Sequence, residues 1–394
     1  MTTQRRLRMG LIGPGWVATH HVDAVRRLGD VDVVAVAGTK ESTARARADQ
    51  MHIEQAYGDY RELLKNPSID VVHNTTASHV HFETSMAVIE AGKHIVSDKP
   101  LALTPAECAK LRDAAKAAGV ANAVTFNYRG NSMVQQARQM LAENQLGALT
   151  YIHGHYLQDW MADPNVYSWR MDPEKGGVSS ALADIGSHWC DLAEHISGAK
   201  ITSVLADLAT AIPTRYKPES GSMGSFTKGE SVAETRKVPV QMFSEDIASI
   251  LLRFDNGARG CVRVGQVLPG HKNDVEIEIN GLDRSIRWQQ EEANDLWVGS
   301  HKQPNAIITK DAGLLLPEAA QFAILPAGHQ EGWADAFAAI VRGIYSWIRA
   351  GGAPEAKPVV VCDFTQATRT CSIIDAMLKS NTAGGVWQTV DTAV

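Results

Sequence analysis

The sequence predicts an α/β protein of two domains, in which a doubly wound parallel sheet precedes an α+β domain with a largely antiparallel sheet. The chain has 394 residues, more than one hydrophobic core usually serves. Short apolar runs alternate with helical patterns in the first third, which favours a parallel sheet with right-handed crossovers. After about Tyr128 the apolar runs follow one another more closely. We therefore place the first domain at residues 1–127 and the second at 128–394.

The first domain is predicted to alternate strands and helices throughout its length. The expected strands are 8–13, 32–37, 70–75, 93–97 and 120–126, and the expected helices lie near 16–28, 41–51, 60–64, 81–91 and 105–118.

The second domain is predicted to start with a helix over 133–143 and to end with helices over 331–349 and 365–379. Asn256-Gly257 separates two apolar runs, which is a strong hairpin signal. Residues 213–237 show no usable period, and we expect a mobile loop there. The expected strands are 149–157, 201–208, 247–254, 259–267, 275–280 and 284–288.

Composition excludes several classes of function. The formal net charge of −6 leaves no broad cationic surface for nucleic acid or an anionic membrane. No apolar run approaches the roughly 20 residues that span a bilayer. The five cysteines are scattered, without a Cys-x-x-Cys pair, which favours reduced thiols in a cytoplasmic protein and argues against a zinc site.

A glycine motif predicts a dinucleotide site. Residues 13–18 read GPGWVA between a predicted strand and a predicted helix. Gly13 permits a tight turn, Gly15 lets the backbone approach a pyrophosphate, and Ala18 is small enough for close helix–strand packing. The helix N-terminus, with Trp16 and Val17, offers N–H groups to the phosphates. A glycine-rich turn is often only a turn, but the strand–turn–helix context favours the functional interpretation.

The end of the second predicted strand bears on the choice of cofactor. NAD-binding proteins usually place Asp or Glu there, whereas this sequence has Gly38-Thr39-Lys40. A hydroxyl and a lysine suit a 2′-phosphate, so NADP(H) is the preferred cofactor. In the alternative, Lys40 is solvated, Glu41 reaches the ribose and NAD(H) binds.

Asp98-Lys99-Pro100 follows the strand predicted over 93–97, at the sheet edge where doubly wound folds hold ligands. A lysine there can donate to a substrate hydroxyl and stabilise negative charge on its oxygen. Proline restricts the lysine to extended conformations. Most lysines are solvated surface residues, so only the position of this motif at the sheet edge favours a catalytic role for Lys99.

These motifs together resemble the Gfo/Idh/MocA family, named for glucose–fructose oxidoreductase, inositol dehydrogenase and rhizopine catabolism. The matching segments are GPGWVA at 13–18, TASHVH at 76–81, EAGKH at 90–94, DKP at 98–100 and DIGSH at 184–188, and we expect the resemblance to extend over nearly the whole chain. The family usually has Glu-Lys-Pro and Thr-Pro-Asn, so Asp98, Ala77 and Ser78 are departures. The resemblance implies a Rossmann domain, an NAD(P)-dependent reaction, and contacts with the cofactor from Thr76, Ser78, His81 and Lys99.

The resemblance also implies a catalytic set of Lys99, Asp184 and His188, and the local chemistry agrees with it. Asp184 and His188 are four residues apart, hence on one face if the segment is helical. His188 suits a general base on a secondary alcohol, and Asp184 can orient it or bind a neighbouring hydroxyl. Asp191 and His195 continue this spacing, but we expect them to cap or solvate the helix end, and no metal is required.

Further side chains are candidates for the substrate pocket. Aromatic rings stack on the apolar faces of sugars, while Arg and Asp bind hydroxyls in pairs. For Trp160 and Trp169 core packing is about equally expected, and Arg129 could instead tie the domains together. The candidates are Arg129, Tyr156, Asp159, Trp160, Trp169, Arg170 and His329.

Three functions remain open. The first is an NAD(P)-dependent dehydrogenase that acts on a secondary hydroxyl of a sugar, sugar derivative or cyclitol, or on the corresponding ketone. The second is a redox-assisted glycoside-cleaving enzyme whose cofactor stays bound. The third is a ligand sensor without catalysis, which the intact Lys99, Asp184 and His188 argue against. A homodimer or homotetramer is expected, because an antiparallel sheet commonly leaves one face uncovered.

Overall fold

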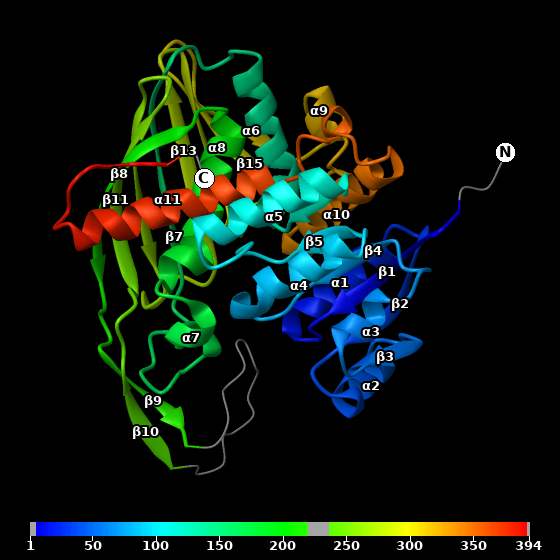
Figure 1. Cartoon of the computed structure of the whole chain (residues 1–394). Helices are drawn as coiled ribbons and strands as arrows, with labels where there is room; N and C mark the ends of the chain where they lie inside the picture. Colours follow the sequence, from blue (N-terminus) through cyan, green and yellow to red (C-terminus); the bar gives the residue numbers. More distant parts are fainter. Residues whose placement is uncertain (1–4, 220–235, 392–394) are drawn as a thin grey trace. The chain divides into compact units, whose positions relative to one another are not determined.

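The computed structural model describes residues 5–219 and 236–391 (Figure 1). Contacts divide the chain into two compact units. Among the described residues, the first contains 5–130 and 333–369, and the second contains 131–219, 236–332 and 370–391. The predicted boundary after residue 127 stays a prediction, although residues 333–369, which we expected in the second domain, group with the first unit.

The described part of the first unit contains a six-stranded parallel sheet, in the order β3-β2-β1-β4-β5-β6. This confirms the doubly wound parallel sheet predicted from the alternating pattern. The last four residues of β1 are all buried, as expected for a strand covered on both faces. The strands are β1 (Leu7–Ile12), β2 (Val31–Ala37), β3 (Gln55–Tyr57), β4 (Val71–Asn74), β5 (His94–Ser97) and β6 (Asn122–Val124).

Two helices of the first unit, α3 and α5, start at a side-chain cap. Thr104 and Glu107 form a reciprocal capping box at the start of α5, with Pro105 at the first helical position. The late helix α10 lies against α1, and Arg27 pairs with Asp335 at 2.8 Å. The helices are α1 (Trp16–Arg26), α2 (Glu41–Gln50), α3 (Tyr60–Leu64), α4 (Ser78–Glu90), α5 (Pro105–Ala118), α10 (Trp333–Arg349) and the beginning of α11 (Phe364–Thr382).

The second unit contains, among its described residues, a nine-stranded sheet in the order β16-β15-β14-β13-β7-β12-β11-β8-β17. All neighbouring pairs are antiparallel except β7 and β12, which confirms a largely antiparallel sheet. The strands are β7 (Leu149–Leu157), β8 (Ile201–Ala209), β11 (Ile247–Phe254), β12 (Arg259–Gly265), β13 (Asp274–Gly281), β14 (Arg284–Gln289), β15 (Asp295–Ser300), β16 (Ala306–Thr309) and β17 (Gln388–Thr389).

The two faces of this sheet differ. Alternate residues of β11 are buried, whereas Leu251 between them is 47% exposed. On the covered face, the Trp189 indole of α8 donates to the Glu276 carbonyl of β13 at 2.9 Å. The helices of this unit are α6 (Ser132–Ala142), α7 (Pro173–Gly176), α8 (Ser187–Ser197), α9 (Pro317–Ala320) and the rest of α11.

The expectation of a loop over 213–237 is wrong at both ends. β9 (Thr214–Pro218) and β10 (Lys237–Gln241) pair as antiparallel strands, while residues 220–235 lie outside the described residues. Arg215 is fully buried in β9 and pairs with Asp246 at 3.2 Å. Because the inward position of β9 is taken by this arginine, the sequence lacks the alternation of apolar and polar residues by which a strand is usually recognised.

Within the described residues, no helix combines the length and apolar character that a bilayer crossing requires.

Candidate active site

The glycine turn joins β1 to α1 in the first unit. Gly13 has φ of +88°, and a Cβ built on it lies 2.7 Å from the Thr76 backbone. Its N–H donates to the Ala37 carbonyl at 2.9 Å. Gly15 is the N-cap of α1 without a side-chain cap, and a Cβ on it meets no atom within 4 Å. The turn thus has the open backbone approach and the helix N-terminus that a pyrophosphate requires.

Two side chains hold this turn. The Arg47 guanidinium of α2 donates to the Pro14 carbonyl at 3.0 Å and to the Gly15 carbonyl at 3.2 Å. The Thr75 hydroxyl donates to the Gly13 carbonyl at 2.7 Å. The sequence analysis missed Arg47, because its contacts are 32 and 33 residues distant in the chain and belong to no local motif.

The end of β2 carries the residues considered for the adenosine ribose. Gly38 is half-buried, and a Cβ there lies 3.6 Å from the Pro14 ring. Thr39 and Lys40 are exposed, and Lys40 is the N-cap residue of α2. The end of β2 thus carries a cationic side chain and a helix N-terminus, which both favour an anion.

The segment after β4 is tied to the lysine motif through His81. One His81 ring nitrogen lies 2.6 Å from the Pro100 carbonyl and the other 2.9 Å from the Thr76 carbonyl. The Thr76 hydroxyl donates to Asn74 at 2.8 Å, and Ser78 is buried at the start of α4. The assignment of Thr76, Ser78 and His81 to the cofactor stays a prediction.

Asp98 and Lys99 directly follow β5, as predicted. One Asp98 carboxylate oxygen accepts from the Lys99 N–H and from the Thr125 hydroxyl, both at 2.9 Å. Burial raises the pKa of Asp98, but nearby positive charge, including that of Lys99, and the hydrogen bond from the Lys99 N–H together lower it by more, so the pKa lies below its usual value. Asp98 is therefore an anion that fixes the backbone of the lysine motif.

A buried polar chain lies in the same unit. The rings of His21 on α1 and His73 on β4 meet nitrogen to nitrogen at 2.9 Å, and His73 reaches the Tyr345 hydroxyl of α10 at 3.1 Å. Burial lowers the pKa of His21 to about 4 and that of His73 well below its usual value. Both imidazoles are accordingly neutral in the folded protein near pH 7.

Asp184 and His188 lie in the second unit on one continuous helical segment, as their spacing predicted. Asp184 is in a π-helical turn, Leu182–Gly186, and His188 is in the first turn of α8. Asp184 accepts from the Gln266 amide at 2.8 Å and lies 3.4 Å from the Arg170 guanidinium. The rings of His188 and Tyr156 lie edge to face with centroids 6.2 Å apart. Four of the predicted residues are thus brought together within one unit.

An amide network that the sequence analysis missed connects these residues. The Gln266 amide donates to Gln158 at 3.3 Å, and the Trp160 indole donates to the same Gln158 oxygen at 2.9 Å. The Tyr156 hydroxyl donates to Asn273 at 2.6 Å. No sequence pattern marks Gln158, Gln266 or Asn273, because single amides recur throughout any chain.

Two other predicted residues have partners within the second unit. Asp159 accepts from Lys272 at 2.5 Å and from the Gly270 N–H at 3.2 Å, and the Lys272 bond keeps the pKa of Asp159 below its usual value. The Arg170 guanidinium lies over the Trp169 ring, 4.6 Å from its centroid. Trp169 therefore contacts the side chain that reaches Asp184.

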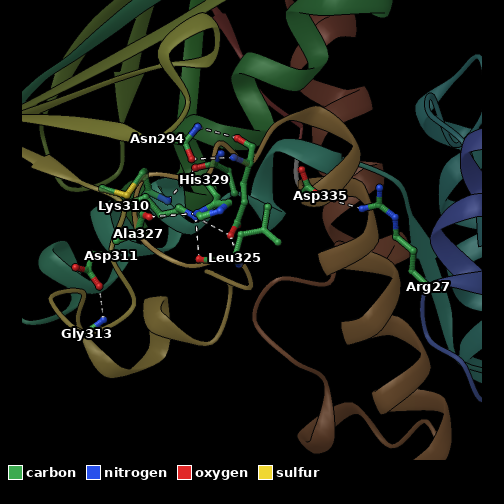
Figure 2. Close-up of polar contacts among 12 residues, drawn as sticks. Arg27, Asn294, Lys310, Asp311, Gly313, Leu325, Ala327, His329 and Asp335 are labelled. Atoms are coloured by element: carbon green, nitrogen blue, oxygen red, sulfur yellow. Dashed lines mark hydrogen bonds and ion pairs between the residues drawn. The ribbon is translucent and has the colours of Figure 1, made fainter.

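Arg129 and His329 complete the set of predicted substrate residues. Arg129 is buried in the first unit, where it donates to Gln366 at 3.2 Å. His329 is exposed in the second unit (Figure 2). Its segment is held by the buried ion pair between Lys310 and Glu331, in which Lys310 Nζ lies 2.9 Å from a Glu331 carboxylate oxygen. Asn294 anchors the same segment through the Glu331 backbone.

The expectation that Asp191 and His195 solvate the helix end is wrong. They are only 3% and 8% exposed. His195 lies 3.0 Å from the Gln135 amide of α6, so this side of α8 packs inside the unit. Among the described residues, no group of three or more His, Cys, Asp or Glu side chains is placed to hold a metal ion.

Comparison with protein families identifies both halves of the chain. Residues 7–126 match the model described as "Oxidoreductase family, NAD-binding Rossmann fold", and residues 134–287 match the "GFO/IDH/MocA C-terminal domain". The chain belongs to the Gfo/Idh/MocA family. It is accordingly an oxidoreductase with an NAD-binding Rossmann domain, as the resemblance of its motifs implied.

Individual members of the Gfo/Idh/MocA family resemble the chain over most of its length. Levoglucosan dehydrogenase of Pseudarthrobacter phenanthrenivorans is 34% identical over 306 residues, which cover 75% of this chain and 76% of the relative. Myo-inositol 2-dehydrogenase of Thermotoga maritima is 25% identical over 272 residues, with 69% and 72% covered.

Solved structures of the Gfo/Idh/MocA family agree with the fold. An oxidoreductase domain protein from Kribbella flavida superimposes with a TM-score of 0.87 at 29% identity, covering 98% of this chain and all of that chain. A levoglucosan dehydrogenase in complex with NADH and L-sorbose gives a TM-score of 0.86 at 28% identity, with 98% and 99% covered.

Proposed function

We propose that this enzyme transfers a hydride between a nicotinamide cofactor and a secondary alcohol or ketone of a sugar, sugar derivative or cyclitol. The observation that carries the proposal is the assembly around Asp184, which lies between Arg170 and Gln266 and one turn before His188. A carboxylate beside an imidazole suits binding and deprotonation of a polyol. The names of the levoglucosan and myo-inositol dehydrogenases support the same class of substrate.

Each member of the proposed catalytic set has a distinct role. His188 removes the proton from the reacting hydroxyl, and Asp184 accepts a hydrogen bond from the hydroxyl on a neighbouring carbon. Lys99 donates to the reacting oxygen and stabilises the negative charge that develops there. The bound nicotinamide supplies the hydride acceptor. Lys99 belongs to the first unit and the other two to the second, so their convergence on one substrate is part of this proposal.

The remaining predicted residues are proposed to shape the substrate pocket. Tyr156 and Arg170 have direct support, since they contact His188 and Asp184. Trp169 supports Arg170, and Trp160 joins the amide network of Gln266 through Gln158. The other substrate residues in the proposal are Arg129, Asp159 and His329.

We propose that NADP(H) is the preferred cofactor, because Thr39 and Lys40 place a hydroxyl and a cation at the end of β2 where a carboxylate would repel a 2′-phosphate. NAD(H) remains a second cofactor, and a levoglucosan dehydrogenase relative is described in complex with NADH. Titration of both cofactors tests the preference. Tighter binding of NADP(H), with the difference removed in Lys40→Ala but kept in Lys65→Ala, supports it, whereas tighter binding of NAD(H) overturns it.

The test of the function is a spectrophotometric screen of monosaccharides, glycosides, anhydrosugars such as levoglucosan, and inositols with each cofactor. We expect net accumulation of reduced cofactor with at least one substrate, and a loss of about 1,000-fold in kcat for Lys99→Met. Substrate cleavage without net cofactor reduction indicates instead a glycoside-cleaving enzyme, and an inert protein across the screen favours a sensor. Unchanged turnover in Lys99→Met refutes the catalytic set.

We further propose a homodimer or homotetramer that pairs through the exposed face of the large sheet, around Leu251. Sedimentation of the wild type and of Leu251→Arg tests this proposal. We also propose a cytoplasmic location, because the five cysteines are all free thiols.

A further inference from the structure

A buried carboxylate in the second unit caps the helical segment that carries Asp184 and His188. Glu245 lies in the turn before β11 and is 4% exposed. One of its oxygens accepts three hydrogen bonds, from the Ser179 hydroxyl at 2.7 Å, the Ser180 N–H at 2.9 Å and the Leu182 N–H at 2.9 Å. Ala181, at the N-cap position, has no capping side chain, and the Ser179 hydroxyl accepts from the Ala183 N–H at 3.2 Å. Glu245 supplies the acceptor for the N–H groups of Ser180 and Leu182 from elsewhere in the chain.

The backbone of the same turn also supports Asp184 indirectly, through hydrogen bonds to Ala181 and Gln266. The Glu245 carbonyl accepts from the Ala181 N–H at 3.2 Å, and the Asp246 carbonyl accepts from the Gln266 N–H at 3.1 Å. Gln266 in turn donates to Asp184 at 2.8 Å. The Glu245–Asp246 turn therefore fixes both the helix that bears Asp184 and the amide that holds its carboxylate.

This carboxylate is retained at a cost in stability. Burial raises the pKa of Glu245 above its usual value, and the bonds from Leu182 and Ser179 only partly offset the effect. A raised pKa in the folded state means that the folded protein holds the proton more tightly than the unfolded chain. The corresponding stability is present at low pH and lost as the pH rises, so ionisation of the buried Glu245 carboxyl disfavours folding.

We propose that Glu245 is a positioning residue of the dehydrogenase reaction, which fixes the first turn of the catalytic helix and with it the direction of Asp184 and His188. The inference rests on the proposed function only in taking those two residues as catalytic. When the negative charge is removed, the N–H groups of Ser180 and Leu182 bond to a weaker, uncharged acceptor and the turn loosens. Asp184, whose N–H bonds to the Ser180 carbonyl at 2.9 Å, then loses its fixed place beside Gln266.

The test compares Glu245→Gln with Glu194→Gln. Glu194 is a matched control because it is also a buried carboxylate that accepts a backbone hydrogen bond, from the Ile201 N–H at 2.8 Å. Unlike Glu245, it lies on α8 itself, near the C-terminal end of that helix. In Glu245→Gln we expect kcat to fall about 10-fold to 100-fold, because a displacement of roughly 1 Å at a reacting group costs about 100-fold. The KM for the cofactor stays within about two-fold and the melting temperature is not lowered, since the buried charge is removed. Glu194→Gln keeps the wild-type kcat.

A lower kcat without a lower melting temperature supports the proposal, whereas a kcat equal to that of the wild type overturns it. A lower kcat accompanied by an equal loss of soluble folded protein also overturns it, because that pattern is purely structural. If Glu245→Gln does not fold, Glu245→Asp serves in its place, as its shorter side chain keeps the charge but cannot satisfy all three donors.

Amide hydrogen exchange separates this inference from the proposed function. In Glu245→Gln the amides of Ser180, Leu182 and Asp184 are expected to exchange about 10-fold faster than in the wild type, while those of α6 keep their rates. If the wild type turns over no sugar, the proposed function fails and these rates alone decide the capping role. Unchanged exchange at all three amides overturns it.

Discussion

Alanine at Gly13 and alanine at Gly15 are expected to have different consequences, although both glycines lie in one turn. At Gly13 the added Cβ lies 2.7 Å from the Cα and N of Thr76 and 2.8 Å from the carbonyl carbon of Thr75. These are backbone atoms that cannot rotate away. Forcing alanine to φ of +88° costs about 1 kcal/mol and the overlap about 1–3 kcal/mol, so Gly13→Ala loses about 2–4 kcal/mol of folding free energy.

Gly15→Ala leaves the free energy of folding nearly unchanged. Gly15 has φ of −77°, which alanine adopts readily, and the new Cβ meets no protein atom within 4 Å. This open side of Gly15 is where we expect the pyrophosphate to approach. We expect the Kd for the cofactor to rise about 10-fold or more, which corresponds to about 1.4 kcal/mol.

Thermal unfolding without cofactor and calorimetric titration with NADH and NADPH measure the two effects separately. Gly13→Ala is expected to melt about 5–10 °C lower and to bind weakly, whereas Gly15→Ala melts with the wild type and binds weakly. Wild-type affinity in Gly15→Ala would refute the assignment of the turn to the pyrophosphate. An unchanged melting temperature in Gly13→Ala would refute the argument from backbone overlap.

Two further predictions concern buried charge. Because burial lowers the pKa of His21 to about 4, against about 6.5 when unfolded, stability is lost as the pH falls from 6.5 to 4, by about 3 kcal/mol in total. In His21→Gln the melting temperature should fall less steeply over this window, and a slope equal to that of the wild type contradicts the assignment. Lys310→Met leaves Glu331 as an unpaired buried charge and should cost about 3–5 kcal/mol in urea unfolding. The double variant Lys310→Met/Glu331→Leu should recover most of that loss, and a double variant as unstable as the single one refutes the reasoning.

Features that the sequence encodes locally were predictable. The GPGWVA turn lies between its strand and helix, and the hairpin around Asn256-Gly257 joins β11 to β12, because in each case the deciding residues are neighbours in the chain. The start of α5 follows from Thr104, Pro105 and Glu107 in the same way.

Features that depend on distant partners were not predictable. β9 was missed because its inward residue is Arg215, whose partner Asp246 lies 31 residues later. The burial of His195 depends on Gln135, 60 residues earlier. The membership of α10 in the first unit depends on packing against α1, which its own amphipathic pattern does not specify.

The candidate site divides along the same line. The sequence motifs predicted that Lys99 follows a strand and that Asp184 and His188 lie on one helix. Both follow from local sequence, because Lys99 comes directly after an apolar run and Asp184 and His188 are four residues apart. The residues that hold them in place, such as Arg47, Gln266 and Glu245, show no pattern. A buried amide or carboxylate acquires its role only from the backbone groups that the fold brings to it.

A crystal structure of the enzyme with cofactor and a sugar found active in the screen tests the central proposal most directly. The measured quantities are the distances from Lys99 Nζ and the His188 ring nitrogen to the hydroxyl on the reacting carbon, and from the Asp184 carboxylate to the hydroxyl on a neighbouring carbon. The account predicts that all three lie at hydrogen-bond distance, about 2.6–3.2 Å. A substrate bound with any of the three side chains more than about 6 Å from those hydroxyls, well beyond one bridging water, contradicts it.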